Sequence, residues 1–126
     1  MVQTDISQTA AECAEWRQAL RTYRDEFSHD KKELEQLCRS SLSKDQLQQV
    51  EHLHNQFHIQ LINIHDLKQS IKVHDRKMNF EKAVFNGNVN EDSLLRHESL
   101  LQEYAELKQM LEEVREEFQQ FLKRTA

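Results

Sequence analysis

Hydrophobic residues in the first third of the chain recur every seven positions. One line contains Ile6, Cys13, Leu20, Phe27 and Leu34, and a second line, three positions further on, contains Trp16, Tyr23 and Leu37. Because seven residues make nearly two turns of an α-helix, both lines fall on one face of a helix. The pattern predicts a long amphipathic helix over about residues 5–39, with Asp30 as a carboxylate within its apolar seam.

A second line with the same spacing runs unbroken through the middle of the chain. It contains Val50, Phe57, Ile64, Ile71, Met78 and Phe85, with Leu47, Leu53, Leu61 and Leu67 on either side. Apolar residues on both sides of such a line indicate a helix that packs against two neighbours. We predict this helix over residues 44–86, and the spacing of Ser43 and Gln46 at its start is that of a capping box.

The last third of the chain predicts a third helix, over residues 91–124. Its apolar line contains Leu100, Tyr104, Leu107, Leu111, Val114, Phe118 and Phe121. Asn90 is placed to cap its start, and Gly87, the only glycine in a chain without proline, can end the middle helix in a left-handed conformation. Because both connections are short, the sequence predicts an all-α fold with a single domain over residues 1–126, an antiparallel bundle of three long, coiled-coil-like helices.

The middle helix also has a second apolar face. At 100° per residue, the five residues of this face lie within about 60° of one another, nearly opposite the main line. They are Ile59, Ile62, Val73, Phe80 and Val84. Single exposed apolar residues are ordinary on soluble proteins, but a face that includes a phenylalanine indicates an interface. We therefore expect a homo-oligomer, most simply a homodimer, or binding of another protein, with Lys72 and Arg76 as orienting charges.

Charge and composition exclude several classes of partner. The chain has 22 acidic and 17 basic residues, which gives a net charge of −5. Its mildly basic stretch around Lys68, Lys72 and Arg76 is interrupted by carboxylates, so no nucleic-acid partner is expected. No stretch approaches the roughly 18 apolar residues of a membrane span, and the amino terminus does not resemble a signal peptide. These features predict a cytoplasmic protein without a membrane partner.

The histidines are the first candidates for chemistry. His54, His58 and His65 lie within about 40° of one another on the middle helix, and the i, i+4 pair formed by the first two can chelate a transition metal. The alternative is structural, because His54 lies beside an apolar line, where pairing with Asp30 would fix the register of the first two helices. His74 and His97 are predicted as hydrogen-bonding residues at the edge of the core.

The remaining residues give no sign of catalysis. Cys13 and Cys38 stand 25 positions apart on one predicted helix, beyond the reach of a disulfide bond, so both are expected as reduced, half-buried residues. The chain lacks a glycine-rich phosphate loop, a Cys-x-x-Cys pair and the other common signatures of enzymes. We predict a non-catalytic interaction or scaffold module without a cofactor. The alternative is a metal- or haem-binding bundle that uses the histidines of the middle helix.

Several stretches of the first two predicted helices resemble a family of small, uncharacterised, all-helical bacterial proteins. The resemblance rests on Trp16 and Tyr23, on the Val-Glu-His-x-x-Asn-Gln-Phe segment at 50–57, on Gln60, and on residues 66–68 and 71–74. The family has no established activity, so the resemblance implies a bacterial, cytoplasmic helical protein without catalysis. Its members carry Phe or Ile where His54 and His58 stand here. In architecture alone, three long helices are also similar to a spectrin repeat.

Overall fold

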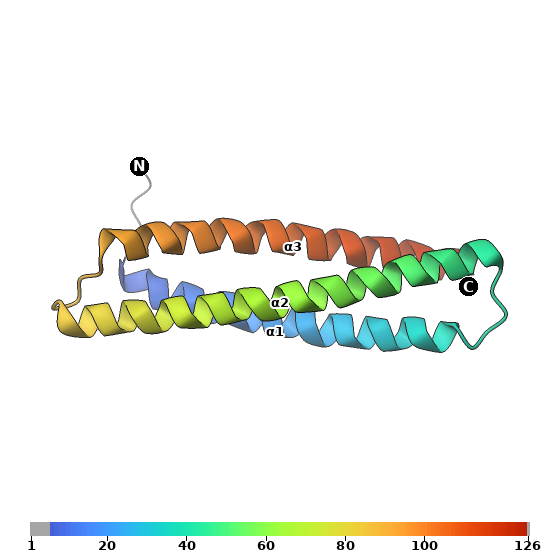
Figure 1. The fold of residues 1–126 in the computed structure, drawn as a ribbon, viewed down its shortest axis with the longest axis horizontal. Coiled ribbons are helices and arrows are strands. Elements are labelled where there is room, and N and C mark those ends of the chain that lie inside the picture. Colours follow the sequence, from blue (N-terminus) through green and yellow to red (C-terminus); the bar gives the residue numbers. More distant parts are fainter. Residues whose placement is uncertain (1–5, 126) are drawn as a thin grey trace.

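The computed structural model describes residues 6–125, which form three long helices joined by two short connections (Figure 1). The helices are α1 (Ile6–Leu37), α2 (Lys44–Val84) and α3 (Glu91–Thr125). The prediction of an all-α fold with three long helices is confirmed, and each observed bound lies within two residues of the expected one. Position 5, the expected start of the first helix, lies outside the described residues.

The start of α2 is fixed by the expected capping box. The Ser43 hydroxyl accepts a hydrogen bond from the backbone N–H of Gln46 at 3.2 Å, and the Gln46 side chain accepts one from the Ser43 N–H at 2.8 Å. Both backbone donors would otherwise have no partner in the first turn of the helix. The two side chains therefore define where α2 begins.

The end of α2 uses two left-handed residues instead of one. Asn86 has φ 54° and Gly87 has φ 89°, and the Gly87 N–H donates to the Lys82 carbonyl at 2.7 Å. Asparagine is the residue that tolerates this conformation best after glycine. The expectation that the Asn90 side chain caps α3 is corrected, because its amide donates to the Glu81 carboxylate at 3.3 Å. The carboxylate of Glu81 is buried and requires donors, so it takes the amide.

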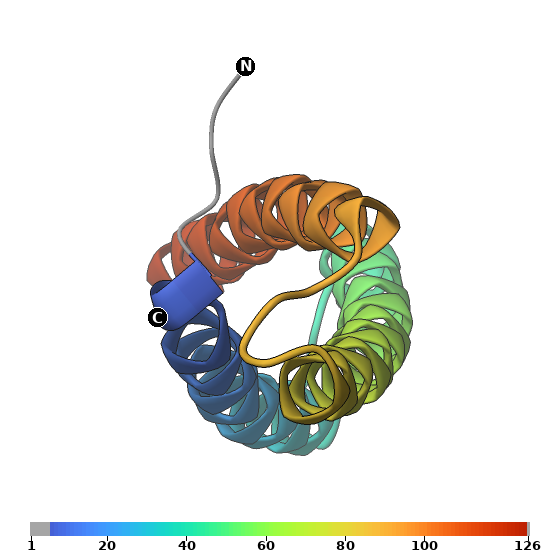
Figure 2. The same cartoon turned by 90° about the vertical axis from the view of Figure 1, so that its left-hand side faces the viewer.

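The three helices lie side by side along their whole length, around a common core (Figures 1 and 2). Contacts between α1 and α2 join early residues of one to late residues of the other, as in Thr9 with Lys82, Arg17 with Asp75 and Glu35 with His54. Consecutive helices therefore run in opposite directions. Backbone contacts of α2 with both neighbours are more extensive than those between α1 and α3, which are joined mainly through long side chains.

The buried residues of α2 alternate in steps of three and four. They are Val50, Leu53, Phe57, Gln60, Ile64, Leu67, Ile71, His74, Met78 and Glu81. In the half of the bundle near the α1–α2 connection, called here the apolar half, Phe57 packs edge-on against Phe27 and Phe118, with ring centroids 5.5 and 5.2 Å away. Burial of each ring contributes about 2–3 kcal/mol, so this triplet anchors the fold.

The predicted register pair is corrected by the structure. Asp30 is buried, but its carboxylate accepts a hydrogen bond from Nε of Arg115 on α3 at 3.0 Å. Arg115 also donates to Glu26 at 2.8 Å. His54 instead lies 3.2 Å from the carboxylate of Glu35. Glu35 is five residues beyond Asp30, about 7.5 Å along a helix, so the connection of residues 38–43 sets a different axial offset than its length suggested.

The second face of α2 lies on the surface, as expected from its position on the helix. The exposed fractions are 40% for Ile59, 47% for Ile62, 63% for Val73, 66% for Phe80 and 54% for Val84. Lys72 and Arg76 are exposed beside them. Within residues 6–125, none of the helices combines the length and the apolar character that a membrane crossing requires.

Candidate metal centre

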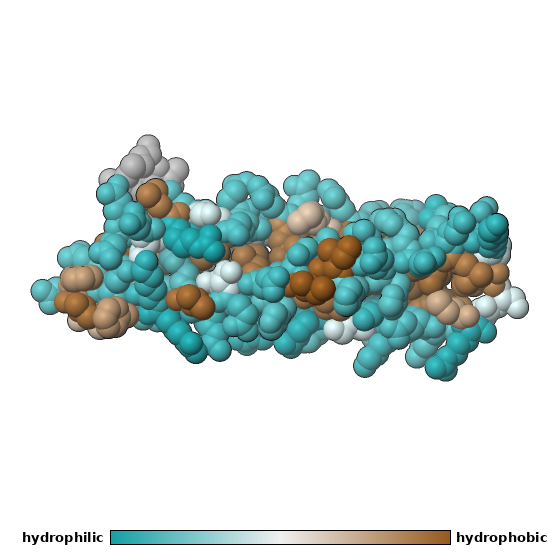
Figure 3. Space-filling model, viewed as in Figure 1, coloured by the Kyte–Doolittle hydropathy of each residue, from teal (hydrophilic) through white to brown (hydrophobic). Residues whose placement is uncertain are grey.

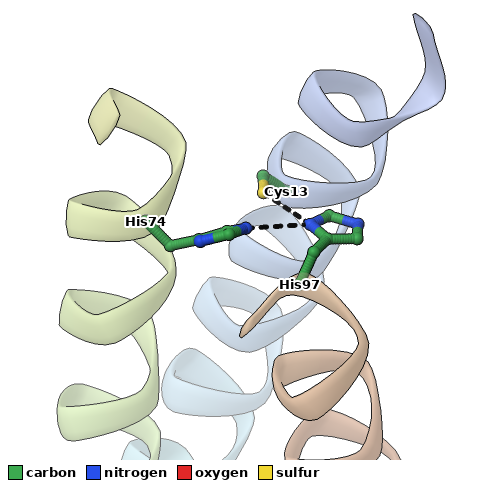
Figure 4. A group of neighbouring side chains, drawn as sticks. All are labelled: Cys13, His74 and His97. Carbon is green, nitrogen blue, oxygen red and sulfur yellow. Dashed lines mark hydrogen bonds between the residues drawn. The ribbon is translucent and has the colours of Figure 1, made fainter. Parts of the chain in front are cut away.

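Three side chains, one from each helix, meet in the core near the α2–α3 connection (Figure 4). Cys13 of α1, His74 of α2 and His97 of α3 are 0%, 4% and 2% exposed. Nε2 of His74 lies 3.1 Å from Nδ1 of His97, and Sγ of Cys13 lies 3.9 Å from that same Nδ1. Among residues 6–125, this is the one group of three such side chains whose ligand atoms all lie within 4.8 Å of one another.

Heptad spacing explains why the three side chains point at one another. Cys13 occupies the first apolar line of α1, His74 continues the buried three-four alternation of α2, and His97 lies three positions before buried Leu100 on α3. Each residue is therefore a core position of its helix. The bundle brings these core positions to one level, so a polar layer replaces an apolar one.

Hydrogen bonding around His97 determines how protons are shared. Nε2 of His97 lies 3.3 Å from the carboxylate of Glu12, which only accepts, so this nitrogen carries the hydrogen. Nδ1 of His97 then presents a lone pair and accepts the Nε2–H of His74. His74 is left with an unprotonated Nδ1, which is buried and has no hydrogen-bond partner. The layer is thus incompletely satisfied, an unusual arrangement for buried polar atoms.

Burial also controls the charge of two of the three residues. Desolvation and the neighbouring His97 lower the pKa of His74 to about 4, so its ring is neutral at physiological pH. Desolvation, with Asp75 and Glu12 nearby, raises the pKa of the Cys13 thiol to about 11. Without a cation in their midst, the side chains of Cys13 and His74 are uncharged.

Neighbouring residues hold the layer in place. The indole of Trp16 stacks on the His97 ring, with centroids 4.9 Å apart and an angle of 30° between the planes. Beyond the layer, Glu81 is 3% exposed and accepts hydrogen bonds from the Asn90 N–H at 2.9 Å and the Ser93 hydroxyl at 3.0 Å. The Asn90 backbone bond is the main reason why the pKa of Glu81 is lowered, and Ser93 adds to it.

The spacing of the three ligand atoms suits a transition metal. In a tetrahedral zinc site, bonds of about 2.0–2.1 Å to nitrogen and 2.3 Å to sulfur place two nitrogens about 3.4 Å apart and a nitrogen and a sulfur about 3.6 Å apart. The observed separations from Nδ1 of His97 are 3.1 and 3.9 Å. One thiolate and two imidazoles favour zinc, copper or cobalt over magnesium or calcium, which prefer oxygen ligands.

The histidines expected to bind a metal are not brought together. His54 interacts with Glu35, while His58 and His65 are exposed on the surface. His54 and His58 line a surface groove of about 660 Å³. His65 is seven residues beyond His58, about 10.5 Å along the helix, so a single ion cannot reach both. The prediction of a three-histidine site on the middle helix is therefore corrected.

Sequence reasoning missed the actual cluster because each member was judged on its own helix. Cys13 is fully buried and Cys38 is exposed, so the expectation that both are half-buried is corrected as well. A signal was present in the spacing. His74 and His97 stand at similar distances on either side of the α2–α3 connection, and Cys13 and His74 do so around the α1–α2 connection. Helices folded back at both connections bring these three positions to one level.

Comparison with known proteins gave no match, whether with protein-family models, curated proteins or solved structures. The resemblance to a bacterial family of uncharacterised helical proteins therefore stays a prediction. The geometry of the polar layer carries the functional argument alone.

Proposed function

We propose that this protein is a metal-binding helical bundle and that Cys13, His74 and His97 hold a transition-metal cation, most simply zinc. The observation that carries the proposal is that three helices each contribute one buried ligand atom, all within 4.8 Å of one another. Buried polar side chains without full hydrogen bonding are costly and therefore rare. A cation in their midst would give every lone pair of this layer a partner.

Binding would rearrange protons in a defined way. Cys13 would lose its thiol proton to become a thiolate, and the hydrogen of His74 would move from Nε2 to Nδ1, which frees Nε2 for the metal. His97 needs no change, because its Nδ1 lone pair already faces the cluster and its Nε2–H bonds Glu12. A carboxylate behind a ligating imidazole is the usual support of such a ligand.

The burial of the ligands supports a structural role over a catalytic one. None of the three side chains is more than 4% exposed, so a substrate has little access to a bound ion. Each ligand comes from a different helix, so an ion would tie all three together. Metal that binds only the folded state stabilises it in proportion to the logarithm of its free concentration over Kd.

Cobalt spectroscopy of protein purified without a histidine tag and under reducing conditions tests the proposal. We expect one equivalent of Co²⁺ to give the intense visible bands of a four-coordinate site together with a sulfur-to-cobalt charge-transfer band, and zinc to displace it. The charge-transfer band should disappear in Cys13→Ser, and the visible bands should weaken in His97→Gln.

The matched control is the double variant His54→Ala and His58→Ala, which removes two surface imidazoles and leaves the layer intact. Its cobalt spectrum should equal that of the unmodified protein. Absence of the charge-transfer band from the unmodified protein, or its loss in the control but not in Cys13→Ser, would refute the proposal.

A further inference from the structure

The outer face of α2 carries a second seam with heptad spacing. Its eight positions each lie two residues beyond a buried position of the same helix and alternate in steps of three and four. They are Ile59, Ile62, Asp66, Gln69, Val73, Arg76, Phe80 and Ala83, and all are exposed. Such spacing keeps the eight side chains on one side of the helix, away from α1 and α3. In Figure 3, brown apolar patches lie along the path of α2 with teal polar side chains between them.

This seam reads the same from both ends. Positions equally distant from Ile71 are chemically complementary: Ile62 matches Phe80, Asp66 matches Arg76, and Gln69 matches Val73. When two helices pack antiparallel around a twofold axis, the residues equally far from the axis on the two copies meet in one layer. The order of residues in the outer seam is what a self-pairing antiparallel helix requires.

We propose that two copies of this chain associate through the outer seam of α2, antiparallel, with the twofold axis at the level of Ile71. Ile62 of one copy packs against Phe80 of the second copy, and Asp66 forms an ion pair with Arg76 of the second copy. Each of these contacts occurs twice because the interface is isologous. The seam from residue 59 to residue 83 extends about 36 Å, most of the length of α2.

The charges select a second copy in this orientation. Within residues 6–125, neither Asp66 nor Arg76 has a salt bridge or a hydrogen bond from its side chain, although other charged residues of α2 such as Asp75 do. A parallel pairing would place Asp66 against Asp66 and Arg76 against Arg76, which is repulsive. The antiparallel pairing turns both repulsions into attractions and covers Phe80, the most exposed aromatic ring of the face at 66%.

Light scattering coupled to gel filtration, at tens of micromolar and in a Cys38→Ser background that excludes disulfide dimers, tests the association. We expect a mass of twice that of the chain. Phe80→Glu should give a monomer with unchanged helical circular dichroism, because its side chain contacts solvent. Leu95→Glu on α3, at a side chain 55% exposed, is the matched control and should remain a dimer. A monomer for the unmodified protein, or a dimer for Phe80→Glu, would overturn the proposal.

A charge swap tests the orientation. Asp66→Arg alone, and Arg76→Asp alone, should each raise the dimer dissociation constant about tenfold, because each replaces two attractive pairs with two repulsive ones. The double variant Asp66→Arg with Arg76→Asp should restore the dissociation constant to that of the unmodified protein. If the double variant dissociates as readily as the single ones, the proposed layers are wrong. This dimer does not depend on metal, so its outcome is independent of the cobalt experiment.

Discussion

The two halves of the bundle contain layers of the same geometry with opposite chemistry. In the apolar half, Phe27, Phe57 and Phe118 supply one ring from each helix, and all are fully buried. In the half near the α2–α3 connection, called here the polar half, Cys13, His74 and His97 supply one ligand atom from each helix. The first layer stabilises the fold through apolar burial and ring packing. The second leaves a buried nitrogen without a partner, so stability alone does not account for it.

The largest effect is expected from breaking the apolar layer. Phe57→Ala removes the ring between Phe27 and Phe118 and leaves a cavity, which should lower the free energy of unfolding by about 3–5 kcal/mol. Denaturant melts of the metal-free protein measure this loss. The comparison of the two halves would fail if His74→Ala, at the equivalent level of the polar half, cost as much.

The ion pair of Asp30 with Arg115 should give the second largest effect. Asp30→Leu leaves the Arg115 guanidinium without its buried partner and should cost about 1–3 kcal/mol. Asp30→Leu with Arg115→Leu should recover much of that loss, whereas Asp30→Leu with His54→Leu should show simple additivity. Coupling between Asp30 and His54 in such denaturant melts would instead restore the pairing that the sequence suggested.

A smaller effect is expected when the polar layer is made apolar. His74→Leu removes the nitrogen without a partner, so the free energy of unfolding of the metal-free protein should change by less than about 1 kcal/mol. The rise in Tm that zinc produces in the unmodified protein should vanish in this variant. A marked loss of stability without metal would show that the histidines are there for the fold itself.

The smallest effect concerns acid stability at the end of the polar half. The pKa of Glu81 is lowered in the folded state, so its carboxylate stabilises the fold above its ordinary pKa of 4.5, and this contribution is lost as pH falls through the lowered value. Unmodified protein should therefore be more stable than Glu81→Gln at neutral pH, with the difference shrinking below about pH 4.5. Equal stabilities at both pH values would contradict the role given to the Asn90 and Ser93 hydrogen bonds.

The sequence allowed the helices and their ends to be predicted because those depend on neighbours in the chain. Heptad lines, the Ser43 and Gln46 capping box and the stop at Gly87 involve residues within one or two turns of each other. The exposure of the second face of α2 followed from the same periodicity. No contact with another helix was needed for any of these.

Contacts between helices were not predicted because they depend on axial offset. An error of five residues in the offset of α1 against α2 was enough to assign His54 to Asp30 instead of Glu35. Arg115, the actual partner of Asp30, belongs to α3, whose position follows from both connections. The polar layer was missed for the same reason, since Cys13, His74 and His97 have meaning as a site only when all three helices are aligned.

X-ray absorption at the zinc edge tests the metal site most directly. Protein loaded with one equivalent of zinc and passed through gel filtration should retain the metal. Its spectrum should show one sulfur at about 2.3 Å and two imidazole nitrogens at about 2.0–2.1 Å. In Cys13→Ser the sulfur contribution should be absent. Loss of zinc on gel filtration, or a retained zinc surrounded only by nitrogen and oxygen, would contradict a metal site formed by Cys13, His74 and His97.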